Sequence, residues 1–172
     1  MLNQNWALAL AYWLHLLATV TWIGGLVTLA LIIPSARRSL PPDTFQALVG
    51  KLQTRLQSLG WFSLIILAGT GMFQLSANPH HTGFLEITSF WALVILIKHI
   101  VIVGMAGISA YLTWGITPAL QRAAFRQARG LEITEIEAWK SQKMQRSEHW
   151  LLNLNLGLAL AVLALTALAR AS

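Results

Sequence analysis

Three side chains that can take part in acid–base or metal chemistry lie inside apolar stretches of this sequence. His15 interrupts one such stretch, and the adjacent pair Lys98 and His99 interrupts another, which runs from Phe90 to Trp114. An ionisable side chain at the centre of a bilayer costs about 3 kcal/mol, so such residues usually face protein or water. Imidazole nitrogens also bind metals and haem iron. These residue types therefore indicate a cofactor or metal site inside a membrane.

The composition is that of a membrane protein. Hydrophobic residues make up 56% of the chain and charged residues only 10%, with a mean hydropathy of +0.60. Such values are too apolar for a soluble domain of this size. The chain has no cysteine, which excludes disulfides, thiolate metal sites and iron–sulfur clusters. The expected partner is the lipid bilayer rather than nucleic acid, because the basic residues lie in loops that also account for membrane orientation.

Four stretches are long and apolar enough to cross a bilayer, which takes about 20 residues. They are residues 6–33, 58–76, 87–117 and 149–169. We expect a single all-α domain that forms an integral membrane four-helix bundle. Pro34 and Pro118 are expected to end the first and third spans, because proline lacks the N–H that a helix interior needs.

Amphipathic or polar helical segments, 35–57 and 119–147, follow the first and third spans. Residues 41–57 have helical periodicity, which predicts a helix at the membrane surface leading into the second span. Gly130 interrupts the later segment. Thr134 and Glu137 have capping-box spacing, so a helix should restart there and continue without a break to Ala169.

Charge predicts the orientation of the spans. Ten of the 12 Lys and Arg residues lie in segments 35–57 and 119–147. Lys and Arg are concentrated in cytoplasmic loops of membrane proteins. Both segments should therefore be cytoplasmic, with both termini on the non-cytoplasmic side of a bacterial-type plasma or internal membrane.

Spans one and three run in the same direction, which places His15 and His99 within a few Å of the same depth at about 1.5 Å per residue. Two His on facing helices of a bundle are a usual way to hold a b-type haem. Span two brings Gly69 and Gly71 to a similar level, where a flat macrocycle could approach the backbone. Helix packing by polar side chains and small residues is the alternative explanation. His80 and His81, in the next loop, are expected to be solvated.

Lys98 strengthens the haem interpretation. All six Asp and Glu residues lie outside the predicted spans, so this layer offers Lys98 no carboxylate. A buried Lys needs a partner or loses its proton. Haem propionates would supply a partner, whereas Cu(I) would place one cation beside another. The sequence leaves open a neutral or hydrated Lys98. Adjacent helix residues point about 100° apart, so Lys98 and His99 would address the edge and the centre of one large ligand.

Three stretches resemble a known family: HLLATVTWIGGL (15–26), LIKHIVIVGMAG (96–107) and LNLNLGLALAVLALTAL (152–168). They are similar to the copper resistance D (CopD) family of four-span membrane proteins, which in turn resembles the HemJ-type protoporphyrinogen oxidases. The matching positions are His15, Trp22, Gly24, Gly25 and Lys98. The HemJ resemblance implies that the first-span His and the third-span Lys handle a porphyrin. The CopD resemblance implies copper import or export.

Three functions follow from these observations. The first is a membrane protein that binds haem b for electron transfer or porphyrin-linked oxidation, with a redox partner or a second copy of the chain as its partner. Its predicted site residues are His15, His99, Lys98, Trp22, Gly69 and Gly71. The second is copper transport through His15, Met72 and His99. The third is a small membrane subunit without a cofactor.

Overall fold

The computed structural model describes residues 2–36, 39, 41–77, 90–130 and 134–171. The described chain is helical apart from a few turn and end residues. The first span contains α1 (Leu2–Val27), η1 (Thr28–Ile32) and α2 (Ile33–Ala36), and the second is α3 (Pro42–Ser76). The third contains α4 (Phe90–Ala110), η2 (Tyr111–Ile116) and α5 (Thr117–Ala128), and the fourth is α6 (Glu135–Ala171). Four helical segments are thus long and apolar enough to cross a membrane, which confirms the predicted all-α integral membrane protein.

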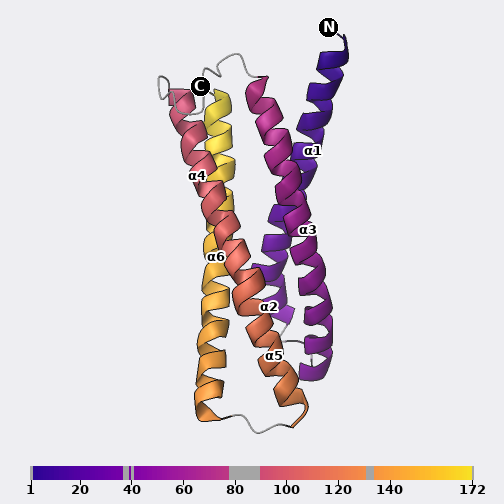
Figure 1. Cartoon of the computed structure of the whole chain (residues 1–172), viewed down its shortest axis with the longest axis vertical. Coiled ribbons are helices and arrows are strands. Elements are labelled where there is room, and N and C mark those ends of the chain that lie inside the picture. The colour runs from indigo at the N-terminus through magenta and orange to yellow at the C-terminus, as the bar shows by residue number, and fades with distance from the viewer. Residues whose placement is uncertain (1, 37–38, 40, 78–89, 131–133, 172) are drawn as a thin grey trace.

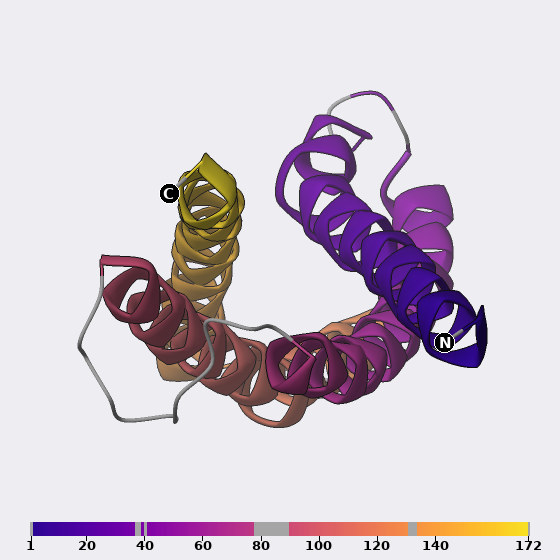
Figure 2. The same cartoon turned by 90° about the horizontal axis from the view of Figure 1, so that it is seen from above.

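The four segments alternate in direction, and both chain ends lie at the same end of the bundle (Figure 1). We call this the terminal end. The opposite end, where α2 leads to α3 and α5 leads to α6, carries the two basic segments and is called the basic end. Viewed from the terminal end, the helices form an arc, with α1 and α3 on one side and α4 and α6 on the other (Figure 2).

The prediction that Pro34 and Pro118 end their spans was wrong. The first span continues to Ala36, and the third continues through Pro118 to Ala128. In both cases a π-helical turn comes just before the proline, η1 before Pro34 and η2 before Pro118. A π-helical turn shifts the hydrogen-bond register within an α-helix. The shift lets each helix continue although proline donates no hydrogen bond.

Residues 42–57 are not a separate surface helix, which corrects the expectation for that part of the chain. They form the first part of α3, which runs unbroken from Pro42 to Ser76. Pro42 stands at the first helical position, where its missing N–H costs nothing. No proline interrupts the rest of the helix, so the amphipathic segment and the second span share one axis.

The start of α6 confirms the predicted capping box. The Thr134 backbone N–H donates to Glu137 Oε2 at 3.2 Å, and the Glu137 N–H donates to Thr134 Oγ1 at 3.3 Å. Arg126 of α5 pairs with the same carboxylate at 2.7 Å. The Thr134 N–H, followed by Arg126, holds the pKa of this exposed carboxyl below its usual value. Gly130, with φ of +66°, lies just after α5. From the capping box onwards, α6 runs unbroken to Ala171.

The core lies midway along the bundle and towards the basic end. The first cluster joins Trp22 and Leu26 of α1 to Met105 of α4 and Ala159 of α6, with partly buried residues of α3 against it. A second cluster, closer to the basic end, joins η1, η2 and α6 through Ala30, Leu112, Ile116 and Leu152. The α1–α3 pair and the α4–α6 pair are therefore held together below the terminal half of the bundle.

Candidate functional site

His15 is held by α3. Its Nδ1 lies 2.8 Å from Thr70 Oγ1, and a Cβ placed on Gly71 would lie 3.5 Å from the imidazole Cε1. That distance is an ordinary van der Waals contact, so the ring lies close to the α3 backbone at Gly71. Gln74, one turn further along α3, donates to the Ala11 carbonyl at 3.2 Å. Polar side chains and a small residue thus fix the register of α1 on α3 around His15, as in other membrane bundles.

The hydroxyl of Thr70 decides which nitrogen of His15 carries the proton. Thr70 Oγ1 donates to the Ile66 carbonyl at 2.6 Å. A hydroxyl has a single proton, so the contact with His15 requires Nδ1–H to donate and the hydroxyl oxygen to accept. In the neutral imidazole, Nε2 then carries the lone pair. This is the arrangement found around metal-binding His, whose second ring nitrogen donates to a neighbouring oxygen.

His99 has the same protonation. Its Nδ1 lies 2.7 Å from the carbonyl oxygen of Ile95, one turn earlier on α4. A carbonyl oxygen can only accept, so Nδ1 carries the proton and Nε2 of the neutral ring carries the lone pair. The two imidazoles are thus set for the same role by different acceptors, a threonine hydroxyl of α3 for His15 and its own helix for His99.

The buried core cluster is a reference point from which positions along α1 and α4 can be compared. His15 comes seven residues before Trp22, Lys98 comes seven residues before Met105, and Trp22 and Met105 belong to one buried cluster. The two helices run in the same direction (Figure 1). Seven residues make about two turns and 10 Å, so His15 and Lys98 each lie about two turns from this cluster, on the sides of their helices that carry it. We call His15, Thr70, Gly71, Lys98 and His99 the histidine layer.

The structure separates the roles of Lys98 and His99. Lys98 shares the α4 face of the buried residues Val94 and Met105, and it is itself partly buried. His99 is also partly buried and is turned about 100° from that face. Lys98 therefore points more directly towards the bundle axis than His99 does.

The remaining predicted site residues lie in different surroundings. Trp22 is buried in the core cluster, one heptad from the histidine layer, and packs rather than lines it. Gly69 is exposed, and a Cβ there would meet nothing within 4 Å. Met72, the proposed copper ligand, is 58% exposed. His80 and His81 lie outside the described residues.

A family model matches residues 17–129, about two thirds of the chain, and is described as a domain of unknown function, DUF4149. The chain belongs to this family. No curated protein and no solved structure matches it. The matched part of the DUF4149 chain includes Thr70, Lys98 and His99, whereas His15 lies just before it. The family description assigns neither ligand nor activity, so the resemblance to CopD and HemJ-type proteins stays an expectation.

The acidic and imidazole side chains of the described chain are dispersed. Within the described residues, no group of three or more His, Asp and Glu side chains could hold a metal ion. The histidine layer contributes two imidazoles and an ammonium, which differs from a site built from clustered carboxylates.

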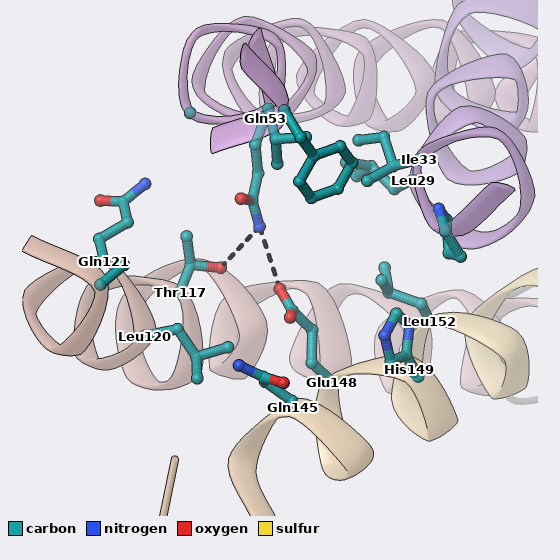
Figure 3. Close-up of a pocket in the computed structure, with 15 residues that line it drawn as sticks. Leu29, Ile33, Gln53, Thr117, Leu120, Gln121, Gln145, Glu148, His149 and Leu152 are labelled. Atoms are coloured by element: carbon teal, nitrogen blue, oxygen red, sulfur yellow. Dashed lines mark hydrogen bonds between the residues drawn. The ribbon is translucent and has the colours of Figure 1, made fainter. Parts of the chain in front are cut away.

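Sequence reasoning missed a polar network at the basic end. Gln53 of α3 donates through Nε2 to Glu148 Oε1 of α6 at 3.0 Å and lies 3.3 Å from Thr117 Oγ1 of α5 (Figure 3). Gln57, one turn along α3, donates to the same Thr117 hydroxyl at 3.2 Å. Thr117 of α5 and Glu148 of α6 thus accept hydrogen bonds from the side-chain amides of two α3 residues, Gln53 and Gln57.

Two signals in the sequence could have indicated this network. Gln53 and Gln57 are four residues apart and therefore share one face of a helix. Glu148 stands directly before the apolar part of the fourth span, an unusual place for an acid that has no basic residue one turn away on either side. Their meeting depends on how α3, α5 and α6 pack, which neither signal contains.

Proposed function

We propose that this protein binds a b-type haem in the histidine layer and transfers electrons within the membrane. His15 and His99 would hold the haem iron, and Lys98 would pair with a propionate. The observation that carries the proposal is the shared protonation of the two imidazoles. Both donate through Nδ1, so in the neutral rings the lone pair is on Nε2, the nitrogen that would bind iron.

The side chains of the histidine layer fit a b-type haem. Two neutral imidazoles are a known ligand pair for haem in helical bundles. Lys98 is expected at the same depth as His15. Its ammonium would then lie beside the edge of the macrocycle. Gly69 is exposed and a Cβ there would meet nothing within 4 Å, so the α3 backbone is uncovered at that position, whereas the His15 imidazole already lies against Gly71.

The bound group would supply one-electron chemistry at its iron. The chain's own residues hold and orient it. Thr70 keeps the proton of His15 on Nδ1, the Ile95 carbonyl does the same for His99, and Lys98 balances propionate charge. Two protein ligands would fill both axial positions, which suits electron transfer rather than binding of oxygen.

The test is the absorption spectrum of the purified protein with haem supplied during expression. We expect a Soret band and sharp α and β bands after reduction. Replacing either ligand, in His15→Ala or His99→Ala, should abolish the low-spin spectrum. His149→Ala is the matched control and should keep it, because His149 lies at the basic end. Lys98→Met should lower haem retention while the helical circular dichroism is unchanged.

A full low-spin spectrum in His15→Ala would contradict the ligand assignment. A protein that lacks haem but retains copper, and loses that copper in both His15→Ala and Met72→Leu, would favour copper transport instead. A protein that retains neither would favour the subunit without a cofactor.

A further inference from the structure

A cavity of about 380 Å³ opens at the basic end, far along the bundle from the histidine layer. Its volume falls in the range of about 300–1,000 Å³ that is typical of small-molecule sites. All four helical segments line it. Its apolar walls include Leu29, Phe45 and Leu152, from the first, second and fourth segments respectively. A ligand with an apolar body would therefore contact side chains of all four segments.

The polar side of the cavity is formed by the network around Glu148, together with Gln121 and Gln145 (Figure 3). Gln53 occupies Glu148 Oε1, and within the described chain Oε2 accepts no hydrogen bond. The carboxyl is partly buried yet faces the cavity. A partly buried carboxylate that has a second oxygen facing a cavity offers a strong acceptor to a charged donor.

The charges around the cavity determine whether it favours a cationic or an anionic ligand. The two basic segments hold ten of the 12 Lys and Arg residues, yet none of the described residues that line the cavity is Lys or Arg. Glu148 is the acid among them, and His149 is the imidazole. An anion entering the cavity would face the carboxylate with no Lys or Arg and only the His149 imidazole as a basic group, whereas a cation would pair with the carboxylate.

We propose that this cavity binds an alkylammonium group, the ammonium on Glu148 Oε2 and the alkyl chain against the apolar walls. An ammonium has three donors. Glu148 accepts one, and the amide oxygen of Gln145, on the same helix, is an acceptor for another. Gln53 is a positioning residue that holds the carboxylate towards the cavity. The site does not depend on haem or on the histidine layer.

Two sources could supply the same chemistry, a free amphipathic amine or the ammonium headgroup of phosphatidylethanolamine. The cavity lies at the end of the membrane-spanning bundle, where either could enter. The two sources are distinguished by the lipid in which the protein is measured.

The experiment is isothermal titration of hexylammonium into the full chain in phosphatidylcholine nanodiscs, with empty nanodiscs subtracted. We expect saturable binding at least tenfold tighter than that of hexanol, and no binding of hexanoate. Glu148→Gln should weaken hexylammonium binding at least tenfold. Glu135→Gln removes an exposed acid from the same helix and should leave binding unchanged.

A second variant keeps the test decisive if Glu148→Gln does not fold. Ala124→Phe fills the cavity from α5 but keeps the carboxylate, and it should abolish binding. Equal affinities for hexylammonium and hexanol, or unchanged binding in Glu148→Gln or Ala124→Phe, would overturn the proposal. In nanodiscs that contain phosphatidylethanolamine, a weaker apparent affinity identifies the lipid as the occupant, and an unchanged affinity identifies a free amine.

Discussion

The single proton of the Thr70 hydroxyl sets the protonation of His15. Because that proton is donated to the Ile66 carbonyl, His15 must donate from Nδ1. On α4 the Ile95 carbonyl imposes the same state on His99. At the scale of single residues, the chemistry available to the two imidazoles thus depends on neighbouring oxygens that are not themselves ligands.

We predict that Thr70→Val releases this constraint. Valine keeps the shape of threonine but accepts no hydrogen bond, so Nδ1–H of His15 loses its partner. The free energy of unfolding should fall by about 1 kcal/mol, the usual net value of one such hydrogen bond. ¹⁵N spectra of histidine-labelled protein should show His15 protonated at Nδ1 in the wild type and a mixture of tautomers in the variant.

Thr21→Val is the matched control for this prediction. Thr21 also donates to a carbonyl one turn earlier, that of Leu17, but this hydrogen bond is exposed, and within the described chain none joins the Thr21 hydroxyl to an imidazole. Its replacement should leave the His15 signals unchanged. Wild-type tautomer signals in Thr70→Val would show that the hydroxyl does not control the protonation.

At the scale of elements, the third segment and α6 are separated by a chain reversal that Gly130 begins. Gly130 has φ of +66°, a conformation that L residues with a Cβ adopt at a cost. The Arg129 and Gly130 N–H groups cap α5 at the Arg126 and Gln127 carbonyls. The capping box at Thr134 then starts α6, so the reversal is determined by local chemistry on both sides.

Gly130→Ala should therefore destabilise the protein by about 1 kcal/mol, the cost of placing a Cβ in the left-handed region. Gly157→Ala is the opposite case, because Gly157 lies inside α6 and a Cβ there would meet nothing within 4 Å. Alanine should leave stability unchanged or raise it by up to about 1 kcal/mol there, through its better helix propensity. Unfolding of both variants in denaturant tests the difference. Equal effects would rule out conformational strain at Gly130 as the cause.

At the scale of the whole molecule, two helix pairs share one core. Met105 is fully buried among residues of α1 and α6 and joins the two pairs midway along the bundle. The alternating helices bring both termini to one end (Figure 1). The two basic segments meet at the other end, where they enclose the proposed ammonium site.

This arrangement predicts a topology that reporter fusions can check. A reporter that is active only on the cytoplasmic side should be active when fused after Gln127 and inactive when fused after Ser172, because ten of the 12 basic residues lie in the segments at the basic end. A reporter active only on the opposite side should give the reverse pattern. The same side for both fusions would contradict four membrane crossings.

The sequence by itself determined the number of membrane-spanning segments, their helical structure and the residues at which α5 ends and α6 begins. These features depend on apolar length, on the capping spacing of Thr134 and Glu137 and on Gly130, all of which act within a few residues. It also predicts an equal depth for His15 and the Lys98–His99 pair, because helices that cross in the same direction have the same rise per residue, and this stays a prediction.

Only the tertiary structure decided the remaining features. The helices continue past Pro34 and Pro118 because π-helical turns change the hydrogen-bond register just before them, and proline identity alone does not reveal such a turn. The acceptor of His15 and the cavity around Glu148 depend on which helix faces meet. Residues 53, 117 and 148 are far apart along the chain, and only the packing of α3, α5 and α6 brings their side chains within hydrogen-bonding distance.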